Sequence, residues 1–144
     1  MNDTIRKFGY PQSLIKEYKH WVVLVRTDQV TLGSLILAHK GAETNMSDVP
    51  KDAFTELAIV TKEIERAIRA AFDNEKVNYL TLMMVDKEVH SHVIPRFSSV
   101  KKFEGQEFSD SGWPVLPVLS EFISLDSDMI KSVKAKLLAN WPSG

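Results

Sequence analysis

The sequence contains no cysteine, which excludes disulfide bonds, thiolate nucleophiles and every zinc site built on cysteine. A nucleophile or a metal ligand therefore has to come from histidine, a carboxylate, a hydroxyl or lysine. The sequence also lacks any run approaching the roughly 20 apolar residues that span a bilayer. Residues 1–14 show no apolar core of the kind found in signal peptides. We expect a cytoplasmic protein with no membrane partner.

An excess of charge of either sign is missing as well. Lysine and arginine total 18 against 19 acidic residues, a formal net charge of -1, so no overall basic field points to nucleic acid. Apolar residues make up 44% and charged residues 26%, the balance of a folded globular chain. A chain of 144 residues is most simply one domain, spanning residues 1–144.

The pattern of apolar residues predicts a small set of elements. Residues 50–74 carry apolar side chains every three or four positions, with charges between them, which predicts a long amphipathic helix with Ser47 or Asp48 near its cap. Asp126 and Asp128 precede a second apolar stripe at about residues 127–140, which indicates a C-terminal helix. The other expected elements are a short helix at 13–20, strands at 21–26, 34–40, 77–85 and 88–97, and an irregular segment from 98.

The order of these elements favours an α+β fold. The two strands before the long helix are joined by a connection of hairpin length, and so are the two strands after it. Each pair of strands is therefore expected to be antiparallel. The simplest arrangement is an antiparallel sheet with helices packed on one face.

Two histidines in the stretch "KEVHSHVIPRF" are the strongest candidates for function. On a strand, alternate residues share a face, so Glu88, His90 and His92 are expected to project together. Three interpretations remain open from the residues alone. The histidines could be ordinary polar residues on a solvated face, they could form a metal site with Glu88, or one of them could attack a phosphorus centre.

The stretch "HSHVIPR" resembles the second half of the motif of the histidine triad (HIT) family. "QVTLGSLILAHK", "NYLTLMMVD" and "FSDSGWP" are similar to segments that occur in this order in compact bacterial members, so the resemblance covers about residues 21–114. It implies a HIT-like α+β fold, in which an antiparallel sheet of about five strands carries a long helix and a C-terminal helix.

The resemblance also implies an activity. Members act as nucleotide hydrolases or nucleotidyl transferases at the α-phosphate of dinucleoside polyphosphates or nucleoside phosphoramidates. The nucleophile that forms a nucleotidyl-histidine intermediate falls on His90, and a contact to the phosphate falls on His92. The family needs no cofactor or metal at this site, takes purine nucleotides or nucleoside phosphates, and usually forms a homodimer.

Several positions depart from the family's pattern. Glu88 stands where the first triad histidine is expected, and an ionised carboxylate accepts hydrogen bonds and repels phosphate. Arg26 occupies the ribose-binding position, with Asp28 close enough to replace it, and Ser34 follows the glycine turn where histidine is common. Arg96 is a further candidate for steering phosphate. These departures leave two alternatives to an enzyme, namely a diverged nucleotide-binding protein with little turnover and a Glu/His/His metal protein.

Overall fold

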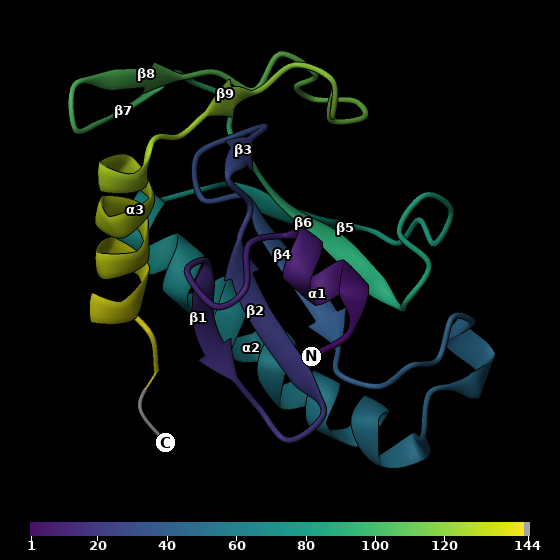
Figure 1. Cartoon of the computed structure of the whole chain (residues 1–144). Helices are drawn as coiled ribbons and strands as arrows, with labels where there is room; N and C mark the ends of the chain where they lie inside the picture. The colour runs from purple at the N-terminus through teal and green to yellow at the C-terminus, as the bar shows by residue number, and fades with distance from the viewer. Residues whose placement is uncertain (143–144) are drawn as a thin grey trace.

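A five-stranded antiparallel sheet forms the centre of the computed structural model, which describes residues 1–142 (Figure 1). The strand order is β1-β2-β4-β6-β5, so β6 lies between β4 and β5, and β5 lies at one edge. The expected α+β sheet of about five strands is thus confirmed. The bounds of the strands are β1 (Leu14–Glu17), β2 (Trp21–Val25), β4 (Leu35–His39), β5 (Lys76–Leu80) and β6 (His90–Arg96).

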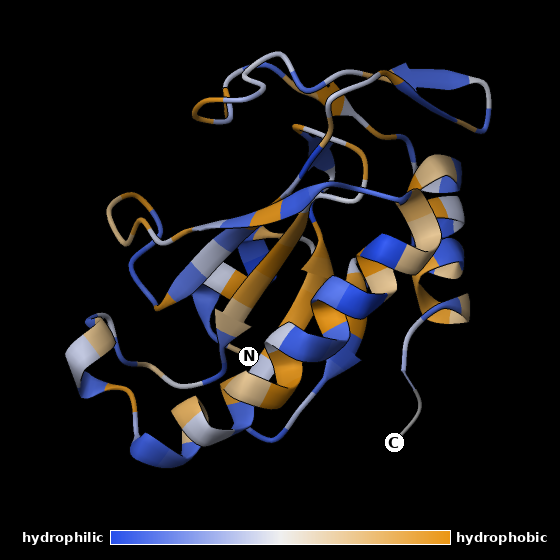
Figure 2. Ribbon diagram, turned by 180° about the vertical axis from the view of Figure 1, so that it is seen from behind, coloured by the Kyte–Doolittle hydropathy of each residue, from blue (hydrophilic) through white to orange (hydrophobic). Residues whose placement is uncertain are grey.

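One face of the sheet is covered by α2 (Lys51–Phe72), the long helix that the sequence predicts. Val60, Ile64 and Ile68 are fully buried and pack in one cluster with strand residues such as Val23 and Val93. Figure 2 shows the alternation of apolar and polar residues along this helix. The helix α3 (Ser127–Ala139) adds two buried side chains to the same cluster, as expected for a C-terminal helix.

The caps of the two helices differ in how well the sequence predicts them. Asp126 is the N-cap of α3 and accepts a hydrogen bond from the Met129 backbone N–H at 2.8 Å. Ser47 and Asp48 lie near the start of α2 as expected, in the short 3-10 helix η1 (Met46–Asp48), but neither side chain caps α2. Pro50 precedes α2 instead, and its fixed φ suits the start of a helix.

The opposite face of the sheet is covered by the N-terminal helix α1 (Asp3–Lys7), which the sequence analysis does not predict (Figure 1). Ile5 is fully buried there against Val22, Leu24 and Ile36. The expectation that the helices share one face is therefore incomplete. Both faces of β2 and β4 are buried, which explains why these strands read as continuous apolar runs.

Several other expectations fail at the level of single elements. Within the expected helix at 13–20, residues 14–17 instead form strand β1, whose backbone pairs with β2. The strand expected at 77–85 ends at Leu80, and residues 81–89 form a loop in which Met84 and Val85 are 80% and 85% exposed. The segment after Arg96 holds a small hairpin, β7 (Lys101–Phe103) and β8 (Gln106–Phe108), and β3 (Asp28–Gln29) pairs with β9 (Ile123–Ser124).

Candidate functional site

His90 and His92 begin strand β6 and lie on the face that carries α1. Their ring centroids are 5.4 Å apart with the rings at 79° to one another. Val89 and Val93 belong instead to the core under α2. The strand alternation therefore places both imidazoles side by side, as the sequence predicts for this pair.

His90 is 1% exposed, and its hydrogen bonding determines its tautomer. The Nδ1 atom lies 2.7 Å from the backbone carbonyl oxygen of Glu88. A carbonyl can only accept, so Nδ1 carries the proton in the neutral ring. The lone pair is consequently on Nε2, which leaves that nitrogen able to attack an electrophile.

His92 has the opposite tautomer. The Nε–H of Arg26 donates to its Nδ1 over 3.4 Å, and a guanidinium can only donate. The proton of the neutral His92 ring is therefore on Nε2. The pKa of His92 is lowered to about 4, mostly by burial and to a smaller extent by Arg26 and His90. Asp86 acts in the opposite direction and raises this pKa. His92 is therefore a neutral N–H donor at neutral pH, next to the Nε2 of His90.

Arg26 follows β2 and is the substrate-binding candidate that lies next to the histidines. Its Nη1 donates to the backbone carbonyl of Asp28, so that residue orients the guanidinium through its backbone. Burial lowers the pKa of Arg26, although an arginine remains charged at neutral pH. The carboxylate of Asp28 accepts from the Ser124 hydroxyl at 2.8 Å.

Ser34 is fully buried in the turn between β3 and β4. Its hydroxyl donates to the Thr31 carbonyl at 2.7 Å and accepts from the Thr31 backbone N–H at 3.1 Å. Gly33 precedes it at φ +89°, where a Cβ would lie 2.9 Å from the Phe72 ring. These bonds give Ser34 a role in closing the turn, and it does not join the histidine pair.

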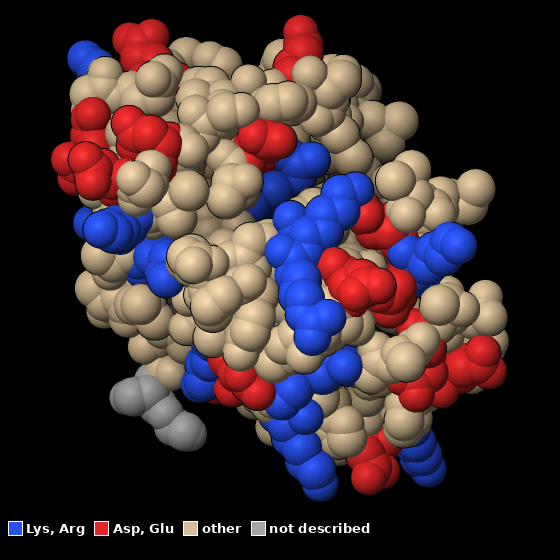
Figure 3. Space-filling model, viewed as in Figure 1, with Lys and Arg blue, Asp and Glu red and all other residues tan. Residues whose placement is uncertain are grey.

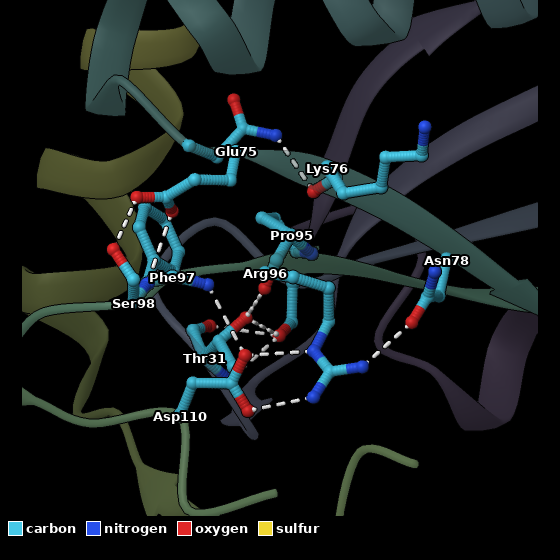
Figure 4. Close-up of polar contacts among 11 residues, drawn as sticks. Thr31, Glu75, Lys76, Asn78, Pro95, Arg96, Phe97, Ser98 and Asp110 are labelled. Carbon is cyan, nitrogen blue, oxygen red and sulfur yellow. Dashed lines mark hydrogen bonds and ion pairs between the residues drawn. The ribbon is translucent and has the colours of Figure 1, made fainter. Parts of the chain in front are cut away.

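Arg96 is at the opposite end of β6, about 20 Å along the strand from His90. Its guanidinium donates to both carboxylate oxygens of Asp110, at 2.7 and 3.1 Å, and to Asn78 Oδ1 at 2.7 Å (Figure 4). Asp110 also accepts from the Phe97 backbone N–H. The expectation that Arg96 steers substrate is not retained, because the ion pair is 95% or more buried and the guanidinium binds Asp110 and Asn78.

Glu88 lies just before β6, so it does not extend the strand alternation of the two histidines. Its Oε1 accepts from the backbone N–H of Thr4 in α1 at 3.3 Å. Among the residues that the structure describes, no group of three or more histidines and carboxylates is arranged to hold a metal. The Glu88/His90/His92 geometry expected for a metal site is therefore not formed in the described residues.

Phe8 is the site residue that sequence reasoning missed. Its ring centroid lies 5.7 Å from that of His90 and 5.8 Å from that of His92. Nothing in the local sequence pattern marks it, since α1 is only five residues long. An indirect signal exists in Asn2, whose side chain caps α1 by accepting from the Ile5 N–H.

The surface over α1 mixes charges of both signs (Figure 3). Lys7 pairs with Asp86 at 2.6 Å, and a hollow of about 390 Å³ opens between this helix and the loop before β6. A larger hollow of about 600 Å³ lies between α2 and β5, away from the histidines. We place the site at the histidines because chemistry, rather than volume, identifies it.

Comparison with known proteins identifies the family of the chain. The family model described as HIT domain matches residues 8–99. No curated protein sequence matches the chain. No helix within the described residues is long and apolar enough to cross a membrane.

Solved structures of histidine triad proteins have the same fold. One from Sinorhizobium meliloti has a TM-score of 0.76 at 18% identity, covering 97% of this chain and 95% of its own. A hypothetical histidine triad nucleotide-binding protein from Sulfolobus tokodaii gives 0.74 at 17%, covering 95% and 88%. A third from Marinobacter aquaeolei gives 0.70 at 21%, covering 90% of each chain. The match to the family model, with this fold and the paired histidines of β6, shows that the chain belongs to the HIT domain family.

Proposed function

We propose that the protein is a nucleotide hydrolase or nucleotidyl transferase that acts at the α-phosphate of a dinucleoside polyphosphate or a nucleoside phosphoramidate. The observation that carries the proposal is the hydrogen bond from His90 Nδ1 to the Glu88 carbonyl, which leaves the lone pair of Nε2 free beside a second imidazole. Membership of the HIT domain family supports a nucleotide as the ligand.

The reaction would proceed in two displacements. The Nε2 lone pair of His90 attacks the α-phosphorus, a P–N bond forms, and the P–O or P–N bond to the leaving group breaks. The leaving group takes the electron pair and a proton from water. The His90 ring becomes positively charged, and the Glu88 carbonyl stabilises it through Nδ1–H. Water then attacks phosphorus and gives up a proton to the solvent, the P–N bond breaks, and the electron pair returns to Nε2, which releases the nucleotide and neutral His90.

The neighbouring groups would bind the phosphoryl oxygens. His92 offers Nε2–H as a neutral donor, and Arg26 supplies a fixed positive charge beside it. A donor and a cation that are already in place stabilise charge developing on the phosphoryl group without reorganisation.

A substrate panel with matched histidine variants tests the proposal. The wild type should consume at least one member of a panel of dinucleoside polyphosphates and purine nucleoside phosphoramidates. His90→Asn should lower kcat at least about 10³-fold, because the nucleophile is gone. His20→Asn is the control, since that histidine lies outside the site and only its backbone N–H bonds to Glu56. Equal turnover by wild type and His90→Asn would exclude His90 as nucleophile.

A second candidate is a nucleotide-binding protein with little or no turnover. The observation that favours it is the burial of His90 under Phe8, together with Glu88 at the position of the first triad histidine. In that case AMP should raise the melting temperature while no panel member is consumed. The less favoured metal protein would require stoichiometric metal in elemental analysis of the purified protein.

We also propose that two copies associate through the edge of the sheet. Among residues 1–142, β5 pairs with β6 on one side and with no strand on the other, so a second strand can add at that edge. An antiparallel β5–β5 contact would join the two sheets into one, as the family resemblance implies.

A further inference from the structure

Phe8 closes the histidine pair from the side of α1. It contacts both imidazoles, and it does so from a segment that is far from β6 in sequence. The chain reverses direction directly after it, at Gly9 with φ +95°. The Ser13 hydroxyl donates to the Phe8 carbonyl at 2.7 Å and fixes the segment on this side.

The other end of the segment is fastened by polar contacts. The Asn2 amide donates to the carbonyls of His39 and Gly41 at 2.9 and 2.8 Å. The Lys7–Asp86 pair is largely solvent-exposed on the lysine side, so it contributes little. Glu88 accepts from the Thr4 N–H, at the first turn of α1 where backbone N–H groups have no helical partner.

Glu88 is the residue that joins this segment to the histidine strand. Its carbonyl holds the Nδ1–H of His90, and its carboxylate holds the backbone of α1. Glu88 therefore sets the tautomer of His90 directly, through its carbonyl, and the position of Phe8 indirectly, through α1. Its carboxylate does not contact either imidazole through a hydrogen bond in the described residues.

We infer that Glu88 is a positioning residue that acts through the N-terminal segment Asn2–Phe8, holding Phe8 over His90 and His92 so that His90 is shielded from water and His92 is partly shielded. The catalytic meaning of this arrangement rests on the proposed function, but the arrangement itself does not. It also accounts for a carboxylate at position 88, because an ionised oxygen is a strong acceptor for an unpaired helix N–H.

The environment of His92 makes the inference measurable. The ionisable groups that face it are Arg26 after β2, His90 on β6 and Asp86 in the loop before β6, and Asp86 is paired with Lys7 of α1. Removing the negative charge of Glu88 acts directly to lower the pKa of His92. Releasing Phe8 exposes the ring to water and raises the same pKa. The two effects have opposite signs.

The experiment is an NMR titration of the His92 side chain in the full-length protein without ligand. Glu88→Ala and Phe8→Ala should each raise the pKa of His92, by about one unit or more. Glu88→Gln keeps an acceptor oxygen for the Thr4 N–H. The pKa of His92 in this variant should be equal to or lower than its pKa in the wild type. Glu88→Ser, too short to reach Thr4, replaces Glu88→Ala if that variant does not fold. Glu75→Ala is the control, since Glu75 binds Ser98 at the other end of the sheet.

The double variant completes the test. In the Phe8→Ala background, Glu88→Ala should no longer raise the pKa of His92, because Phe8 is the means by which Glu88 acts. The inference is overturned if Glu88→Ala leaves the pKa unchanged or lowers it, or if the rise persists without Phe8. The titration needs no turnover, so an inactive protein with the expected shifts would refute the proposed function alone.

Discussion

At the scale of the residue, the two imidazoles of β6 differ in which nitrogen carries the proton. A carbonyl fixes Nδ1–H in His90 and a guanidinium fixes the Nδ1 lone pair in His92. Both Nε2 atoms are thus assigned, one as an acceptor and one as a donor. An attacking nitrogen and a donor for phosphoryl oxygens require this complementary pair.

The lowered pKa of His92 predicts a pH dependence of stability. Its folded pKa of about 4 lies below the unfolded value of about 6.5, so between these values the unfolded chain binds more protons. The free energy of unfolding should therefore fall as pH falls from about 6.5 toward 4. Urea unfolding at several pH values measures it, and His92→Asn should reduce the slope in this window. Equal slopes in both proteins would contradict the burial of a neutral His92.

Residue roles are predictable from the sequence only where a local period determines them. The shared face of His90 and His92 follows from strand alternation. The engagement of Ser34 by Thr31 and of Arg96 by Asp110 depends on tertiary contacts, which the sequence pattern does not contain. Phe8 reaches the histidines by the same kind of contact.

At the scale of the element, α2 is predictable because its apolar stripe extends over many turns. The segment 13–20 is not, because four residues of β1 carry too short a pattern to separate a strand from a helical turn. The strand expected at 77–85 is too long because apolar residues such as Met84 suggest that it continues. Met84 is instead exposed in the loop after β5.

The end of strand β6 is predicted to depend on the buried ion pair. Asp110→Ala leaves the Arg96 guanidinium buried without its carboxylate and should lower the free energy of unfolding by about 3–5 kcal/mol. Guanidinium or urea unfolding measures the change. Asp73→Asn, which removes an exposed pair with Arg69, should cost less than about 1 kcal/mol. Similar small losses in both variants would show that Asp110 does not hold the strand end.

At the scale of the whole molecule, the histidine pair lies at one end of β6 and the buried Arg96–Asp110 ion pair at the other. The open edge of β5 is the place where a second copy would extend the sheet. Light scattering coupled to size exclusion should give about twice the chain mass of 16.3 kDa at micromolar concentration. The mass of a single chain at that concentration would contradict association through this edge.

We propose that His90 becomes covalently attached to the nucleotide during the reaction. The most direct measurement is rapid acid-free quenching of the protein with an α-³²P-labelled adenosine substrate, followed by localisation of the label by peptide mass analysis. We predict label on His90 in the wild type and in His20→Asn, and none in His90→Asn. Turnover of the substrate with no label on any histidine, or with label that persists in His90→Asn, would contradict the account.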